Sequence, residues 1–180
     1  QSFYLHENNE ILIEQCRKGN HAACKKLYEL YSRAMFNICL RMLNNHDDAE
    51  DVLQDAFLQV FKNIKSYRGD ASIGSWIKRI VINNCINYLN KRKIIWEPAD
   101  GLEVPEEEAI DEQKFSLTVA RLKQAIHQLP DGYRVVLTMY LMEDYSHKEI
   151  AGLLGITEST AKTQYMRAKE KVRKMMVNSY

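Results

Sequence analysis

Apolar residues recur at three- and four-residue steps along most of the chain. In the N-terminal part these steps link Leu12, Cys16, Ala23, Leu27, Leu30, Tyr31, Ala34, Met35, Ile38 and Cys39. Residues at such steps share one face of a helix, so they predict helices that bury that face. No segment has the sustained alternation of apolar and polar residues typical of a half-buried strand, and 7 glycines with 3 prolines are few for a turn-rich β protein,. The pattern predicts an all-α fold.

The clearest amphipathic pattern covers residues 47–64. At about 100° per residue, one face of this helix carries Ala49, Val52, Leu53, Ala56, Phe57, Val60, Phe61 and Ile64,. The opposite face is acidic and polar, and Leu58 lies there among Asp51, Gln54 and Asp55. This leucine is either an isolated exposed side chain without a role or the centre of a docking surface for a basic protein partner.

Basic and aromatic residues are interleaved over residues 62–93. The basic ones are Lys62, Lys65, Arg68, Lys78, Arg79, Lys91, Arg92 and Lys93, and the aromatic ones are Tyr67, Trp76 and Tyr88. Basic side chains neutralise phosphates, and flat rings stack on unpaired bases at roughly 1–3 kcal/mol each. We expect a loop at residues 66–70 and then a helix near 72–89 with outward positions at Lys78, Arg79, Ile82, Asn83 and Asn90. This favours nucleic-acid binding over the alternative of a solvated basic face.

Charge is segregated along the chain, although the net charge is only +1. It is −3 over residues 1–60, +7 over 61–93, −8 over 94–113 and +5 over 114–180. The acidic block has no Lys or Arg and contains Pro98, Gly101 and Pro105. Such a stretch cannot bury enough apolar surface to fold alone, so we expect an acidic flexible linker at 94–113. Two small helical domains, 1–93 and 114–180, would lie on either side of it.

A helix-turn-helix is predicted in the C-terminal domain. Ser146 and Glu149 have the spacing of a capping box, Gly155 suits the left-handed end of a helix, and Thr157 can cap the next one,. In the second helix an inner face carries Ala161, Tyr165, Ala168 and Val172. Its outer face carries Ser159, Lys162, Thr163 and Met166, flanked by Arg167 and Lys169. A polar, basic outer face suits the DNA major groove, and an ordinary helical hairpin is the alternative.

Cysteine usage and missing motifs limit the other functions. Cys16, Cys24, Cys39 and Cys85 have irregular spacing without a C-x-x-C pair, so we expect reduced, buried thiols, no metal site and a cytoplasmic protein,. No apolar run reaches the length of a membrane span, and the N-terminus does not resemble a secretory signal,. Phosphate-loop, zinc-protease and serine-hydrolase motifs are absent, so we expect no enzyme activity, no catalytic residue and no cofactor.

Three motifs in this order resemble the extracytoplasmic-function (ECF) sigma factors of the bacterial sigma-70 family. They are DDAEDVLQDAFLQVFKNI, SYRGDASIGSWIKRIVINNCINYLNKRK and the LP..YRVVL segment with its following helix-turn-helix. The resemblance spans residues 11–176. It implies a sigma factor that binds core RNA polymerase and directs promoter-specific transcription initiation in an extracytoplasmic stress or signal response. The implied partners are core RNA polymerase, promoter DNA and an anti-sigma factor.

The resemblance also implies roles for individual residues. The core-polymerase-binding helix would use Asp51, Gln54, Asp55 and Leu58. The minus-ten promoter element would be melted and recognised by Tyr67, Arg68, Gly69, Asp70, Trp76, Lys78, Arg79 and Asn83. The minus-thirty-five element would contact Ser159, Thr160, Lys162, Thr163 and Met166, with phosphate contacts from Arg134 and Arg167. The linker would thread the active-site cleft of the polymerase or act as a plain tether.

Two residues depart from the family pattern, and one rival class remains. Ala161 replaces a β-branched residue, and Gln164 replaces an arginine, which we expect to remove a charge near DNA. The rival is a regulator with a C-terminal helix-turn-helix controlled by a ligand or by phosphorylation. It requires a sensing domain with a phosphoacceptor strand or ligand pocket, and the N-terminal half has the pattern of neither.

Overall fold

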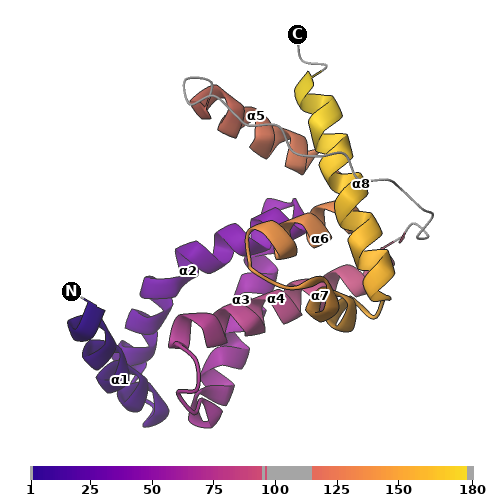
Figure 1. Ribbon diagram of the computed structural model, residues 1–180. Helices are drawn as coiled ribbons and strands as arrows, with labels where there is room; N and C mark the ends of the chain where they lie inside the picture. The colour runs from indigo at the N-terminus through magenta and orange to yellow at the C-terminus, as the bar shows by residue number, and fades with distance from the viewer. Residues whose placement is uncertain (1, 95, 97–114, 178–180) are drawn as a thin grey trace. The chain divides into compact units, whose positions relative to one another are not determined.

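The computed structural model describes residues 2–94, 96 and 115–177 (Figure 1). Every regular element in those ranges is a helix, which confirms the all-α prediction. The chain divides into two compact units, Gln1–Lys91 and Arg92–Tyr180. The predicted linker at 94–113 lies outside the described residues except for positions 94 and 96. Its boundaries and its flexibility therefore stay predictions.

The N-terminal unit contains α1 (Ser2–Arg17), α2 (His21–Leu43), α3 (His46–Asn63), the short 3-10 helix η1 (Ile64–Ser66) and α4 (Ile73–Lys91). Asparagines start two of these helices. The Asn20 side chain accepts a hydrogen bond from the Ala23 amide at 3.1 Å, and Asn45 accepts one from the Asp48 amide at 3.0 Å. These bonds satisfy amides that the first helical turn leaves without a partner.

Helix α2 lies at the centre of this unit and contacts α1, α3 and α4. The core between them contains the fully buried side chains of Leu27, Met42, Ile77, Val81 and Leu89. Gly74 allows α4 to approach α2 closely, because a Cβ at this position would lie 3.0 Å from Cε1 of Tyr31. Any larger residue at Gly74 would displace the Tyr31 ring.

The helical period is correct in this unit, but three residues lie on the other side from the one expected. Leu30 and Ala34 of α2 are exposed, because the buried line of that helix runs through Leu27, Met35 and Ile38 and leaves them beside it. Ile82 of α4 is buried, against our expectation. Helix α4 packs against both α2 and α3, so two of its sides are covered.

The prediction that all four cysteines are reduced is wrong for one pair. Cys16 in the last turn of α1 and Cys24 in the first turn of α2 form a disulfide, with Cα atoms 5.1 Å apart. The turn between the helices is short, and Gly19 adopts a φ of 82° that reverses the chain within it,. Cys39 and Cys85 are free and buried. A hydrogen bond to Cys39, together with burial, raises the pKa of the Cys85 thiol well above its usual value.

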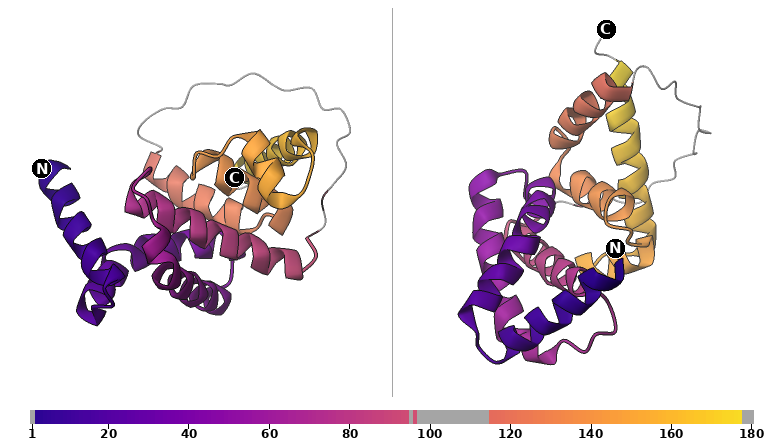
Figure 2. Two further views of the ribbon diagram at one scale, coloured as in Figure 1. Left: turned by 90° about the horizontal axis from the view of Figure 1, so that it is seen from below. Right: turned by 90° about the vertical axis from the view of Figure 1, so that its left-hand side faces the viewer.

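The C-terminal unit contains α5 (Phe115–His127), α6 (Asp131–Leu141), α7 (His147–Leu154) and α8 (Glu158–Val177). Helix α8 contacts each of the other three, as the yellow helix of Figure 2 illustrates. A cluster between α5, α6 and α8 forms the core of this unit, with Ala125, Ile126, Leu129, Tyr133, Leu137, Ala168 and Val172.

The predicted helix-turn-helix consists of α7 and α8. Its capping box is complete: the Ser146 Oγ accepts from the Glu149 amide at 3.3 Å, and Glu149 Oε2 accepts from the Ser146 amide at 2.8 Å. Gly155 ends α7 at a φ of 67°, in the left-handed region that favours glycine,. The Thr157 hydroxyl then accepts from the Thr160 amide at 3.0 Å and starts α8. The caps expected from the sequence are confirmed.

The described residues contain neither a membrane-spanning helix nor a metal-binding cluster. None of the helices there combines the length and the apolar character needed to cross a bilayer. The same ranges contain no group of three or more His, Cys, Asp or Glu side chains placed to hold a metal ion.

Candidate functional site

The outer face of α3 is an acidic surface with a leucine at its centre. Asp51, Gln54, Asp55 and Leu58 are all exposed, and Leu58 has 69% of its surface accessible. The opposite face of α3 is buried, so this set is free to meet a partner. We call these four residues the acidic docking patch.

A groove between α2 and α3 lies beside the acidic docking patch. It is lined by Tyr28, Ser32, Arg33, Phe36, His46, Glu50, Leu53 and Gln54. Sequence patterning did not find this groove because its walls come from two helices.

The segment Tyr67–Asp70, which the sequence predicts to contact the minus-ten element and which we call the minus-ten loop for that prediction, is anchored at Tyr67 and projects beyond it. The Tyr67 hydroxyl donates to the Ala71 carbonyl at 2.6 Å, and its ring lies 5.4 Å from the Trp76 ring. Partial burial raises the pKa of Tyr67, which favours the protonated hydroxyl that donates this hydrogen bond. Arg68, Gly69 and Asp70 are exposed, and Gly69 adopts a φ of 81°. The loop is thus fixed at its ends and open at its tip.

One face of α4 continues from this loop. Trp76, Arg79 and Asn83 are spaced by three and four residues, so they share that face,. Arg79 is exposed, and the other two are half-buried. Lys78 is not brought to this face, because it lies in line with Ile82, Cys85 and Leu89, all of which are buried. The structure therefore groups the minus-ten loop with three of the four predicted α4 residues.

Sequence reasoning missed one residue next to the loop. Arg17, in the last turn of α1, donates from Nε to the Ile64 carbonyl at 3.3 Å and from its guanidinium to the Tyr67 carbonyl. Both acceptors are backbone atoms about fifty residues further along the chain. No local pattern in the sequence signals such a contact.

The outer face of α8 carries most of the predicted minus-thirty-five residues. Ser159, Lys162, Thr163 and Met166 lie on this face, and all are at least partly exposed. Lys162 pairs with Glu158 at 2.8 Å, and a hydrogen bond from Lys162 lowers the pKa of Glu158. On the flank of the face are Thr160 and Arg167, both half-buried. The Thr160 hydroxyl lies 2.8 Å from the Thr157 hydroxyl and so takes part in the helix cap.

Two predictions about residues near DNA are not supported by where the side chains lie. Arg134 was expected to grip phosphate, but it is buried, with its guanidinium donating to the Leu129 carbonyl at 2.8 Å and pairing with Asp131. These contacts tie α6 to the turn that joins it to α5. Gln164 was expected to remove a charge near DNA, but it is 1% exposed because it lies on the inner side of α8. Both side chains are buried within the C-terminal unit.

Three aromatic rings hold the helix-turn-helix to α6. The Tyr140 ring stacks on His147 of α7 at 4.2 Å and lies 4.5 Å from Tyr165 of α8. Burial, with a contribution from Lys162, lowers the pKa of His147, which favours the neutral imidazole. A neutral ring packs between tyrosines without the cost of a buried charge. The outer face of α8 is therefore held in a fixed orientation within its unit.

A helix-turn-helix and a basic, aromatic loop-and-helix surface define a class of helical DNA-binding transcription proteins. Within this class, the family model described as Sigma-70 region 2 matches residues 27–94, and the model described as Sigma-70, region 4 matches residues 120–172. The chain is 30% identical to the ECF RNA polymerase sigma factor SigW of Bacillus subtilis, over 91% of this chain and 94% of that protein. It is 26% identical to the ECF RNA polymerase sigma-E factor of Escherichia coli, over 91% and 92%.

The chain belongs to the ECF sigma factors of the sigma-70 family. As such it binds core RNA polymerase and directs transcription initiation at promoters in an extracytoplasmic stress response. Its fold resembles the sigma factor RpoE of Bartonella quintana, solved in complex with the anti-sigma factor NepR, with a TM-score of 0.54 and 18% identity over 87% of this chain and 98% of that one. It also resembles CnrH in complex with the cytosolic domain of CnrY, with a TM-score of 0.54 and 21% identity over 94% and 97%.

Proposed function

We propose that this sigma factor divides its work among three surfaces. The acidic docking patch binds core RNA polymerase, the minus-ten loop and the α4 face open and recognise the minus-ten element, and the outer face of α8 recognises the minus-thirty-five element. The observation that carries this proposal is the grouping of Trp76, Arg79 and Asn83 on one α4 face directly after the anchored loop.

The chemistry of the loop and α4 suits an unpaired DNA strand. A base that leaves the duplex loses its stacking partner, and an aromatic or guanidinium plane can replace that partner. Exposed Arg68 and Arg79 supply positive charge for the phosphates of the displaced strand,. Asp70 and the backbone around Gly69 offer acceptors and donors at the exposed loop tip. The whole surface therefore favours single-stranded over double-stranded DNA.

The outer face of α8 suits the major groove of duplex DNA. Lys162 and Thr163 would meet base edges, with Ser159, Thr160 and Met166 beside them, and Arg167 would contact phosphate. Arg134 is left out of this set because its guanidinium is bound within its own unit. A phosphate contact contributes equally on all sequences, whereas a base contact changes which sequence is preferred.

Promoter selection by reconstituted holoenzyme tests both DNA surfaces. Arg79→Ala should reduce opening of the minus-ten element, measured by the permanganate reactivity of unpaired thymines, while Lys78→Ala on the other side of α4 should change it less. Lys162→Ala and Thr163→Ala should each re-rank a library of minus-thirty-five elements, at about 1–3 kcal/mol per lost base contact. Arg167→Ala should lower transcription from all promoters of the library to the same extent. It should also reduce the slope of log affinity against log salt concentration by about one. An unchanged ranking with both Lys162→Ala and Thr163→Ala would remove α8 as the recognition helix.

The remaining assignments extend the same proposal. The acidic segment 94–113, most of which lies outside the described residues, would join the two DNA-binding units and enter the basic channel of the polymerase as a mimic of nucleic acid. The chain would act in the cytoplasm without catalytic residues or a cofactor of its own. An anti-sigma factor would hold it inactive by covering the surfaces that bind polymerase and DNA.

A further inference from the structure

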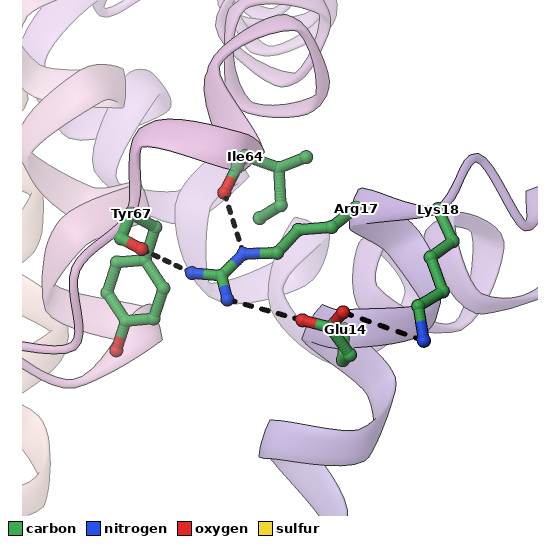
Figure 3. A network of polar contacts seen from close by, with 5 residues as sticks. All are labelled: Glu14, Arg17, Lys18, Ile64 and Tyr67. Atoms are coloured by element: carbon green, nitrogen blue, oxygen red, sulfur yellow. Dashed lines mark hydrogen bonds and ion pairs between the residues drawn. The ribbon is translucent and has the colours of Figure 1, made fainter.

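The last turn of α1 holds the start of the minus-ten loop through a single side chain. Figure 3 shows the Arg17 guanidinium reaching from α1 to two carbonyl oxygens, those of Ile64 and Tyr67. Its third direction is taken by Glu14, whose Oε2 lies 3.4 Å from Arg17 Nη1. Glu14 also pairs with Lys18, which points away from the loop and contacts neither carbonyl.

These two acceptors are the ones that define the turn into the loop. The Ile64 carbonyl already accepts from the Tyr67 amide at 3.3 Å, which closes the turn of η1. By binding the Ile64 and Tyr67 carbonyls together, Arg17 holds both ends of this turn. Tyr67 is then held at its carbonyl by Arg17, at its hydroxyl by Ala71 and at its ring by Trp76. The exposed tip of the loop begins at the next residue.

Arg17 is itself held in place by contacts along α1. The disulfide between Cys16 and Cys24 joins the residue before Arg17 to α2. Earlier in α1, the Asn9 side chain donates to the hydroxyl of Tyr31 on α2 at 3.4 Å. Two separate ties to α2 therefore set the position from which Arg17 reaches the loop. A planar guanidinium can serve two carbonyls at once, which a lysine ammonium on a flexible stem does less well.

We propose that Arg17 is a positioning residue for the minus-ten loop, acting from α1, which precedes the residues 27–94 matched by the Sigma-70 region 2 model. The inference rests on the proposed function of that loop. Arg17 does not touch DNA in this role. It holds the Tyr67 backbone so that Arg68, Gly69 and Asp70 present one conformation to the displaced strand.

The test uses holoenzyme and a forked promoter whose minus-ten non-template strand is already single-stranded. Arg17→Ala should weaken binding to this fork roughly tenfold, because DNA must then order a loop that about one charge-assisted hydrogen bond no longer holds in place. It should also reduce the differences in affinity among forks that carry A, C, G or T at the unpaired position contacted by the loop. Arg17→Lys should fall between Arg17→Ala and the parent, because it keeps the charge and loses the planar pair of donors.

Lys18→Ala is the matched control, since it removes a neighbouring charge from the same helical turn and from the same glutamate. Its fork binding and base preference should equal those of the parent. Affinity for core polymerase and preference among minus-thirty-five elements should stay unchanged in all three variants, while Arg17→Ala should lower the thermal midpoint because it removes two hydrogen bonds,. A purely structural role for Arg17 would lower core affinity as well and leave base preference intact, which would overturn the proposal.

A loop variant separates this inference from the proposed function. If Asp70→Ala leaves fork binding and base preference unchanged, the loop is not the reader, and the proposed function fails first. If Asp70→Ala changes them and Arg17→Ala does not, only the inference about Arg17 fails. If Arg17 acts through the loop, Arg17→Ala should have a smaller effect in the Asp70→Ala background than alone, because residues in one contact network do not add.

Discussion

At the scale of single residues, two side chains have an exposure that is unusual for their chemistry. Leu58 is an apolar residue on an acidic, solvent-facing helix surface, and Arg134 is a charged residue inside a helical unit. An exposed leucine adds little to folding, so Leu58 is available for the docking role proposed for it. A buried arginine must have partners in place, and Leu129 and Asp131 provide them,.

Replacing Leu58 with glutamate should separate binding from folding. We expect Leu58→Glu to weaken the affinity for core polymerase while changing the free energy of unfolding by less than about 0.5 kcal/mol. Fluorescence-detected binding and urea unfolding measure the two quantities. Leu30→Glu is the control, because Leu30 is 51% exposed on α2 outside the docking patch and should leave core affinity unchanged. Substantial unfolding of Leu58→Glu would place this leucine in the core instead.

Arg134 should behave as a folding residue. We expect Arg134→Ala to lower the unfolding free energy of the C-terminal unit by roughly 1.5–3 kcal/mol, since it removes hydrogen bonds from a buried charged group. Urea unfolding of the full chain, followed by a probe in that unit, measures this. A phosphate contact would give the opposite result, with normal stability and a reduced salt dependence of promoter binding.

At the scale of elements, the ends of the helices are set by capping side chains and by residues with a left-handed backbone conformation. Asn20 and Asn45 start α2 and α3, and the Ser146–Glu149 box starts α7. Gly155 ends α7 in a conformation that other residues adopt only with strain,. The orientation of α8 relative to α7 therefore depends on one backbone conformation.

Gly152 within α7 and Gly155 at its C-terminal cap make a matched pair. Gly155→Ala should destabilise the C-terminal unit by about 1 kcal/mol, because the left-handed conformation disfavours a Cβ although no atom lies within 4 Å of it,. Gly152→Ala should stabilise the unit by about 0.5–1 kcal/mol, because Gly152 is helical and its Cβ would also meet open space,. Thermal unfolding of both variants gives the sign of each change in stability. If the two changes had the same sign, the end of α7 would not be fixed by Gly155.

Much of the fold could be predicted from the sequence because helical period and capping are local. The caps at Ser146, Gly155 and Thr157 depend on neighbours within four residues, and all three were found from the sequence. The errors at Leu30 and Ile82 arose because the period shows which residues share a face but not how many faces are covered. The Cys16–Cys24 disulfide, the buried Arg134 and the contacts of Arg17 depend on how helices meet, which no local pattern encodes.

At the scale of the whole molecule, the chain combines two units with different DNA chemistry. The N-terminal unit has aromatic and basic groups around an open loop, and the C-terminal unit has a polar helix face. Each has its own hydrophobic core. The two proposed DNA surfaces thus lie on units that each have a core of their own.

Limited proteolysis of the free chain tests this division. Cleavage should occur first within residues 94–113 and release two helical fragments, because a proline-containing acidic segment without a core offers the most accessible backbone. Mass spectrometry of the early fragments locates the cuts, and circular dichroism shows whether each fragment stays helical. Early cuts inside residues 20–90, with 94–113 intact, would contradict the two-domain organisation.

The disulfide beside Arg17 has a consequence for motion. Helix ends open and close on their own, and the start of α1 can do so without moving its last turn, because Cys16 stays bonded to Cys24 on α2,. Arg17 lies in that last turn and therefore keeps its contacts with the Ile64 and Tyr67 carbonyls while the start of α1 opens. Amide hydrogens at the two ends of α1 should therefore exchange with solvent at very different rates, and reducing the disulfide should bring those rates together.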